Sequence, residues 1–132
     1  MKAAFRIPVR VYYQDTDAGG VVFHAQYLAF MERARTELLN AAGIDIARIA
    51  DEKRLLFLVF QIAVKYHQPA RLNDLLTVSA EVAKMGRASL VFRQRVERGG
   101  ELLVEGDVTV ALVDRERMKP ARMPAELEQA LK

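Results

Sequence analysis

The chain has 132 residues, 52% of them hydrophobic, which is enough for one domain with its own apolar core. It has no cysteine, which excludes disulfides, thiolate nucleophiles and cysteine-based zinc sites. The formal net charge is +3. The basic residues are scattered, which leaves open either a solvated basic surface or a phosphate-bearing small ligand. No aromatic-rich motif supports nucleic-acid binding. We therefore predict a single domain over residues 1–132 and no nucleic-acid partner.

The hydropathy pattern argues against secretion and against insertion in a membrane. Arg6 and Arg10 interrupt the N-terminal region where a signal peptide would need an apolar run. The most apolar stretch, residues 55–64, contains Gln61 and has about half the length that a helix needs to cross a bilayer. We expect a cytoplasmic protein that is not an integral membrane protein.

The first third of the chain predicts a strand, a loop and a long helix. Residues 5–13 alternate between apolar and polar side chains, as in a half-buried strand, and Pro8 places this strand at a sheet edge or at a bulge. The apolar spacing becomes helical over residues 25–42, and Gly43 is a typical helix stop. The first turns of this helix, residues 27–31, are apolar all round, which predicts that sheet surrounds its N-terminal half.

The remainder of the chain is dominated by β-type patterns. Residues 44–54 fit either a short helix or a loop. The segments with strand-like composition are residues 55–68, 75–84, 87–98 and 102–114, and a final short helix is expected over 125–131. The dipeptide Gly99-Gly100 is a hairpin signal, and Gly106 marks a bulge or a close backbone approach. The order predicts an α+β fold, one long helix against an antiparallel sheet of about five strands. Its uncovered edges favour homo-oligomerisation.

The loop before the long helix gathers the residues suited to reaction chemistry, namely Asp15, Asp17, Gly19, Gly20 and His24. The amide groups of a helix's first turn are unpaired, and the helix dipole favours negative charge there. An aspartate in this place is most often a cap or a turn former, so the residue types alone give both acids and the histidine equal claims. Asp15, Asp17 and His24 also suggest a metal site, but no spacing demands coordination, and we predict no metal.

A longer motif resolves these claims. The pattern is Tyr13-x-Asp15-Thr16-Asp17-x-x-Gly20-Val21-Val22-Phe23-His24-x-x-Tyr27, followed by Glu32-Arg33-Ala34-Arg35-x-Glu37. It resembles the hotdog-fold acyl-CoA thioesterases of the 4-hydroxybenzoyl-CoA thioesterase type. It is most similar to their YbgC-like branch, which is associated with the Tol–Pal cell-envelope system. The similarity continues in residues 64–72, 89–92 and 118–120. Three residues depart from the branch: Phe23 stands in place of the usual Tyr, while Lys65 and His67 replace the frequent Glu and Tyr.

The resemblance implies a hotdog fold, in which a curved antiparallel sheet wraps the long helix. It implies hydrolysis of an acyl-CoA to the free acid and CoA without a cofactor. It further implies a homodimer or homotetramer with active sites at the dimer interface, and possible protein partners in the cell envelope or in lipid metabolism.

The resemblance also assigns roles within the loop. Asp17 is the carboxylate that attacks the thioester or acts as general base on water, and the His24 N–H donates to the oxyanion. The His24 side chain would orient the carboxylate, position water or protonate the leaving thiolate. Gly19 and Gly20 would allow the backbone to approach the substrate. Asp15 then holds the loop.

Other residues receive secondary roles. Glu32 is a reserve acid, because another branch of hotdog enzymes carries its acid on the helix, although a structural pair with Arg35 is the favoured interpretation. Lys84 and Arg87 flank a turn and are candidate contacts for the CoA phosphates, a solvated turn being the alternative. Tyr27 and Met31 are expected in the core, with a place along the acyl channel as the alternative. Phe57, Val59 and Phe60 are expected to shape the acyl pocket across the dimer interface.

Two other functions compete with thioester hydrolysis. One is a hotdog dehydratase acting on acyl carrier protein substrates, but the helix lacks the acid-bearing pattern of such enzymes. The other is a non-catalytic adaptor that binds acyl thioesters or a protein partner at the inner membrane surface. The Asp17 and His24 pair argues against the adaptor.

Overall fold

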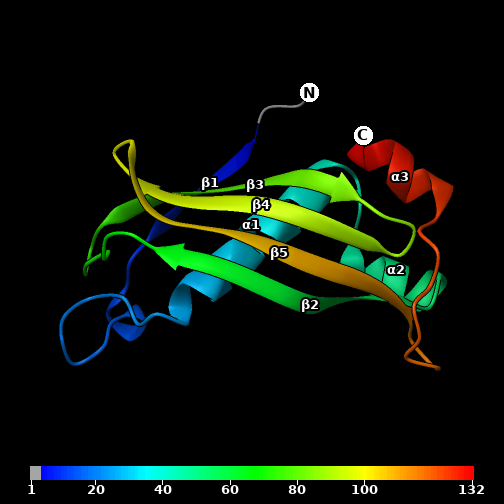
Figure 1. Ribbon diagram of the computed structural model, residues 1–132, viewed down its shortest axis with the longest axis horizontal. Coiled ribbons are helices and arrows are strands. Elements are labelled where there is room, and N and C mark those ends of the chain that lie inside the picture. The colour runs from blue at the N-terminus through cyan, green and yellow to red at the C-terminus, as the bar shows by residue number, and fades with distance from the viewer. Residues whose placement is uncertain (1–3) are drawn as a thin grey trace.

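The computed structural model describes residues 4–132, and in it the long helix α1 (Gln26–Ala41) lies across one face of a five-stranded antiparallel sheet (Figure 1). The strand order is β1-β3-β4-β5-β2. The strands are β1 (Phe5–Arg10), β2 (Leu55–Tyr66), β3 (Leu75–Met85), β4 (Ser89–Arg98) and β5 (Glu101–Asp114). The predicted α+β class, with one long helix against about five strands, is confirmed.

Alternation along the strands creates the surface on which α1 packs. Alternate residues of β3 from Leu76 to Ala80, and of β4 from Leu90 to Val96, are fully or almost fully buried. The facing side of α1 is buried as well, with Phe30 and Met31 both at 0% exposure. Apolar burial of this kind is the main favourable term in folding, so the contact between α1 and the sheet holds the start of α1 in place.

The two edges of the sheet differ in character. Pro8 lies in the edge strand β1, paired with Thr77 of β3, where its missing N–H costs no bond on the outer side. The other edge strand, β2, has β5 as its one strand neighbour within residues 4–132 and is mostly exposed although its sequence is strongly apolar. A long apolar edge is a surface that other chains pair with.

Several predicted boundaries change. Strand β1 ends at Arg10 instead of residue 13, because Tyr13–Asp15 forms a 3-10 turn (η1). The ambiguous segment is the helix α2 (Ile46–Glu52), whose N-cap Asp45 accepts a hydrogen bond from the Arg48 N–H at 3.2 Å. The C-terminal helix α3 (Ala125–Leu131) follows Pro124, as predicted.

Gly106 is a close approach rather than a bulge. A Cβ atom there would lie 2.8 Å from the Ala63 carbonyl oxygen of the neighbouring strand. The bulge occurs in β2 itself, between Val59 and Gln61, where the pairing with β5 shifts register.

The predicted enclosure of the N-terminal half of α1 is wrong for a single chain. Ala29, within the segment that is apolar all round, is exposed, because the sheet covers only one side of the helix. The expected Glu32–Arg35 pair is also absent from residues 4–132. Arg35 is buried and donates to Gln94 Oε1 at 3.0 Å instead. Burial lowers the pKa of the Arg35 guanidinium, and the nearby Glu32 charge opposes that effect.

Candidate active site

The loop between η1 and α1 is a short antiparallel hairpin with Asp17 near its tip. Thr16 pairs with Val22, and the Asp17 N–H donates to the Val21 carbonyl at 2.9 Å. The turn closes through Gly20, whose φ of +81° lies in the left-handed region that favours glycine. In Figure 1 this loop projects from one end of the sheet, directly before the first turn of α1.

Asp15 is the scaffold of the loop. Its side chain is 2% exposed, and both of its oxygens are engaged. Oδ2 accepts from the Tyr12 N–H at 2.8 Å, and Oδ1 accepts from Gln26 Nε2 at 2.9 Å. The carboxylate thus connects the start of the loop to the first residue of α1. This arrangement agrees with the structural role expected for Asp15.

Asp17 has the opposite environment and is exposed. Its Oδ1 accepts a hydrogen bond from the Gly19 N–H at 2.8 Å, and Oδ2 has no partner within residues 4–132. Gly19 lies close enough that a Cβ there would be 3.2 Å from Asp17 Oδ1. One carboxylate oxygen is therefore oriented by the backbone while the other is free to react.

The start of α1, which follows the hairpin that carries Asp17, presents backbone N–H donors. Within residues 4–132 the N–H groups of His24 and Ala25 have no hydrogen-bond acceptor, and the helix has no side-chain N-cap. The Gln26 N–H donates to the Phe23 carbonyl at 2.8 Å, which closes the turn behind them. Free amides at a helix N-terminus, where the dipole is positive, are suited to an oxyanion.

A cleft of about 280 Å³ opens between the start of α1 and the end of β2, lined by Val22, His24, Tyr27, Tyr66, His67, Gln68 and Pro69. Tyr27 was predicted to lie either in the core or along the acyl channel. It is 3% exposed, as a core residue is, and it also forms part of the cleft wall. Its hydroxyl accepts from the Ala70 N–H at 2.9 Å. Burial, reinforced by the neighbouring Tyr66, raises the pKa of the Tyr27 phenol despite the bond from Ala70, so this group stays protonated at neutral pH.

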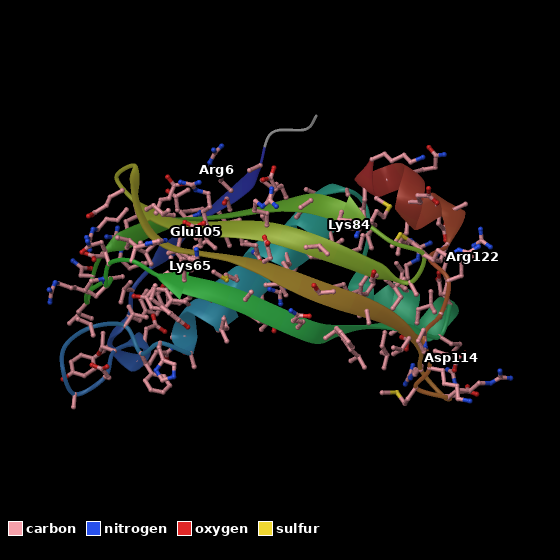
Figure 2. The ribbon with its side chains drawn as sticks, viewed as in Figure 1. Arg6, Lys65, Lys84, Glu105, Asp114 and Arg122 are labelled. Carbon is pink, nitrogen blue, oxygen red and sulfur yellow. The ribbon has the colours of Figure 1, made fainter. Side chains whose placement is uncertain are left out.

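Lys84 and Arg87 are not brought near Asp17 within one chain. Strand β3 begins opposite Arg10, at the loop end of the sheet, and runs to Met85, ten residues further on. At ~3.3 Å per residue this separation is roughly 33 Å. Figure 2 shows Lys84 near the end of the sheet opposite the loop. There it lines a larger cavity of about 670 Å³ beside the C-terminal ends of α1 and α3, away from Asp17.

Val59 lies on the edge strand β2 and is 49% exposed, next to Phe60 at the bulge. Within the described residues, neither of the two cavities given above has Val59 or Asp17 in its lining, so the predicted role of Val59 in the acyl pocket depends on a second chain. His67, expected on the strand surface, is exposed and contacts Glu105 at 2.9 Å.

Sequence reasoning missed two residues that contact the loop. Gln26 binds Asp15, and the Tyr66 hydroxyl donates to the His24 carbonyl at 2.9 Å. Gln26 occupies an unassigned position between His24 and Tyr27, and its only signal was a polar residue ahead of an apolar run. Tyr66 fitted the apolar alternation of its strand, which gave no indication of its hydrogen bond.

Across residues 4–132 no cluster of three or more acidic or histidine side chains is arranged to hold a metal ion, and the expectation of metal-free chemistry stays a prediction. In the same part of the chain no helix is both long and apolar enough to span a bilayer.

Residues 19–105 match the family model described as the thioesterase superfamily, which covers well over half of the chain. The chain belongs to the thioesterase superfamily. It is 46% identical to the acyl-CoA thioesterase YbgC of Haemophilus influenzae over 96% of this chain and 93% of that protein. It is 48% identical to the acyl-CoA thioester hydrolase YbgC of Escherichia coli over 93% of this chain and 92% of that protein.

Solved structures of thioesterases share the fold. A probable thioesterase from Bartonella henselae aligns with a TM-score of 0.88 and 34% identity, covering 92% of this chain and all of that one. The predicted family, its hotdog fold and its thioester hydrolase activity are confirmed. The roles of individual residues stay predictions. The geometry of the loop makes them more specific, because it separates the engaged carboxylate of Asp15 from the exposed one of Asp17.

Proposed function

We propose that this thioesterase hydrolyses acyl-CoA to a free acid and CoA, with Asp17 as the reacting carboxylate and the amides at the start of α1 as oxyanion donors. The observation that carries the proposal is the position of an exposed carboxylate, one oxygen unpartnered, on the hairpin that leads into the unpaired His24 and Ala25 N–H groups. The YbgC relatives in Haemophilus influenzae and Escherichia coli are named for acyl-CoA thioester cleavage.

The reaction follows from the charges in the site. Asp17 either attacks the thioester carbonyl, giving an anhydride that water then hydrolyses, or removes a proton from an attacking water. Both routes place negative charge on the carbonyl oxygen, where one helix-terminal donor is worth roughly 3 kcal/mol of transition-state stabilisation. The C–S bond then breaks, and CoA leaves as a thiolate, which receives the proton that the attacking water gives up. The reaction uses no metal or redox cofactor.

The site is completed by a second copy of the chain at the β2 edge. Strand β2 has an unpaired outer edge, and its exposed apolar residues are Leu58, Val59, Phe60, Ile62 and Tyr66. Phe23, beside His24, is also exposed at 47%. A homodimer that covers this surface removes the apolar residues from water and encloses the loop, so that Val59 and Phe60 border the acyl group. A tetramer, a cytoplasmic location and a connection to the Tol–Pal system stay predictions.

The test is thiol release from a panel of acyl-CoA substrates by the wild type, by Asp17→Asn and by the control Asp51→Asn. Asp51 is an exposed aspartate of α2 that contacts only Arg115. We expect a loss of at least about a hundredfold in kcat for Asp17→Asn alone, as for removal of a principal acid–base or nucleophilic group. Comparable rates for the two variants would overturn the role of Asp17. Absence of thiol release by the wild type from every acyl-CoA would overturn the activity and favour the adaptor.

A further inference from the structure

Tyr66 contacts the peptide group that joins the two oxyanion donors. It is the last residue of β2, and its hydroxyl donates to the His24 carbonyl oxygen at 2.9 Å. That carbonyl belongs to the same peptide unit as the Ala25 N–H. The phenol of an edge strand is thereby bonded to the first turn of α1, 42 residues away in sequence.

This hydrogen bond determines where the Ala25 N–H points. In a planar trans peptide the C=O and N–H bonds point in opposite directions, so a carbonyl that is held on one side aims its N–H to the other. The structure has no cis peptide bonds among residues 4–132. A donor at the carbonyl also polarises the peptide unit, which strengthens the N–H as a donor. The Tyr66 hydroxyl thus both orients and activates an amide at the oxyanion position.

The aromatic ring of Tyr66 is itself held in place. It packs edge-on against Tyr27, with ring centroids 5.7 Å apart and an interplanar angle of 64°. Tyr27 accepts a hydrogen bond from the Ala70 N–H, and the Ala70 carbonyl accepts one from the Val22 N–H, each at 2.9 Å. The segment after β2 therefore holds the hairpin on one side while Tyr66 holds the helix start on the other.

We propose that Tyr66 is a positioning residue for the oxyanion-binding amide of Ala25, an inference that rests on the proposed thioester hydrolysis. Tyr66 does not touch the reacting atoms. It acts through the peptide it binds, because catalysis by fixed dipoles requires that the donors are oriented before the charge develops. The contribution of Tyr66 is then to kcat, while binding of the CoA portion is unaffected.

The variant Tyr66→Phe tests the proposal, because it keeps the ring and its packing on Tyr27 and removes only the hydroxyl. We expect kcat to fall about tenfold, the equivalent of one hydrogen bond of ordinary strength, with KM within about twofold and Tm unchanged. Tyr12→Phe is the matched control. Tyr12 is 59% exposed, its hydroxyl has no hydrogen bond within residues 4–132, and its loss should leave kcat unchanged.

A pair of inhibitors distinguishes positioning from a purely structural role. A trifluoromethyl ketone analogue of acyl-CoA forms a tetrahedral adduct with an oxyanion, whereas the thioether analogue has no carbonyl oxygen. We expect Tyr66→Phe to weaken binding of the ketone about tenfold and binding of the thioether by less than about twofold. Equal weakening of the binding of both analogues, or an unchanged kcat, would overturn the role of Tyr66 and leave the proposed thioester hydrolysis intact. A wild type that releases no thiol would overturn the proposed function and this inference with it.

Discussion

Asp15 and Asp17 are separated by a single residue, yet the fold uses their carboxylates in different ways. Asp15 is 2% exposed, and its two oxygens are bonded to Tyr12 and Gln26. Asp17 is exposed, and within residues 4–132 its carboxylate accepts one hydrogen bond, from the Gly19 N–H of its own turn. A carboxylate with both oxygens engaged by fixed donors stabilises the loop, whereas one with a free oxygen is available to a substrate.

Replacement of each acid by alanine should separate these two roles. Asp15→Ala leaves the partly buried Tyr12 N–H and Gln26 amide without their acceptor, which should lower the free energy of unfolding by about 1–3 kcal/mol. Asp17→Ala removes an exposed group and should change it by less than about 0.5 kcal/mol. Urea denaturation of both variants beside the wild type measures the difference. Similar destabilisation by the two substitutions would contradict the scaffold role of Asp15.

Pairing between β2 and β5 sets the position of the strand that carries Tyr66. Gly106 of β5 pairs with Val64 of β2, two residues before Tyr66. A Cβ at residue 106 would lie 2.8 Å from the Ala63 carbonyl oxygen and 3.0 Å from Val64 Cγ2, both in β2. Space for β2 beside β5 thus depends on the absence of a side chain at this one position.

Gly106→Ala should therefore displace β2 and lower the free energy of unfolding by about 1–3 kcal/mol, as overpacking against backbone commonly does. Glu105→Ala, at the preceding residue, is the control. It removes only a half-exposed contact with His67 and should cost no more than about 1 kcal/mol. Chemical denaturation compares the two variants. A Gly106→Ala chain as stable as the wild type would show that β2 adjusts to the new Cβ without cost.

The sequence pattern predicts the elements of this fold better than it predicts what covers them. Alternation correctly located the strands, and helical spacing located α1 to within a residue at either end. Periodicity reports which side chains are apolar, but not which neighbour buries them. Ala29 was therefore expected to be enclosed by the sheet, whereas it is exposed in the single chain.

Prediction of the site from the sequence is limited in the same way, because local patterns do not reveal which distant residues meet. The motif resemblance singled out Asp17 and His24, because a motif records residue types at fixed spacing. The hydrogen bond from Tyr66 to His24 joins residues 42 positions apart, and nothing local in the sequence reveals such a contact. Lys84 and Arg87 were chosen for their charge at a turn, but the direction of β3 carries them to the opposite end of the sheet from Asp17.

At the scale of the whole molecule, the exposed apolar surface and the candidate site lie on the same side. The exposed side chains of β2 continue through Tyr66 to the loop, where Tyr13 is 81% exposed and Phe23 47%. Large apolar side chains that gather in this way on a monomer mark an interaction surface. Assembly and activity are therefore expected to depend on each other, because one partner chain would cover both the exposed apolar surface and the candidate site.

Phe60→Glu tests this dependence. Phe60 is 76% exposed at the bulge of β2, so a glutamate there is tolerated in the single chain. At a buried dimer interface the same charge would be unpaired and should weaken association by roughly 3–5 kcal/mol. We expect a folded monomer by light scattering and a loss of thiol release that high protein concentration partly restores. Met118→Glu, an exposed apolar residue beyond the end of β5, should change neither property. A Phe60→Glu protein that remains dimeric would place the interface elsewhere, and a fully active monomer would show that one chain contains the complete site.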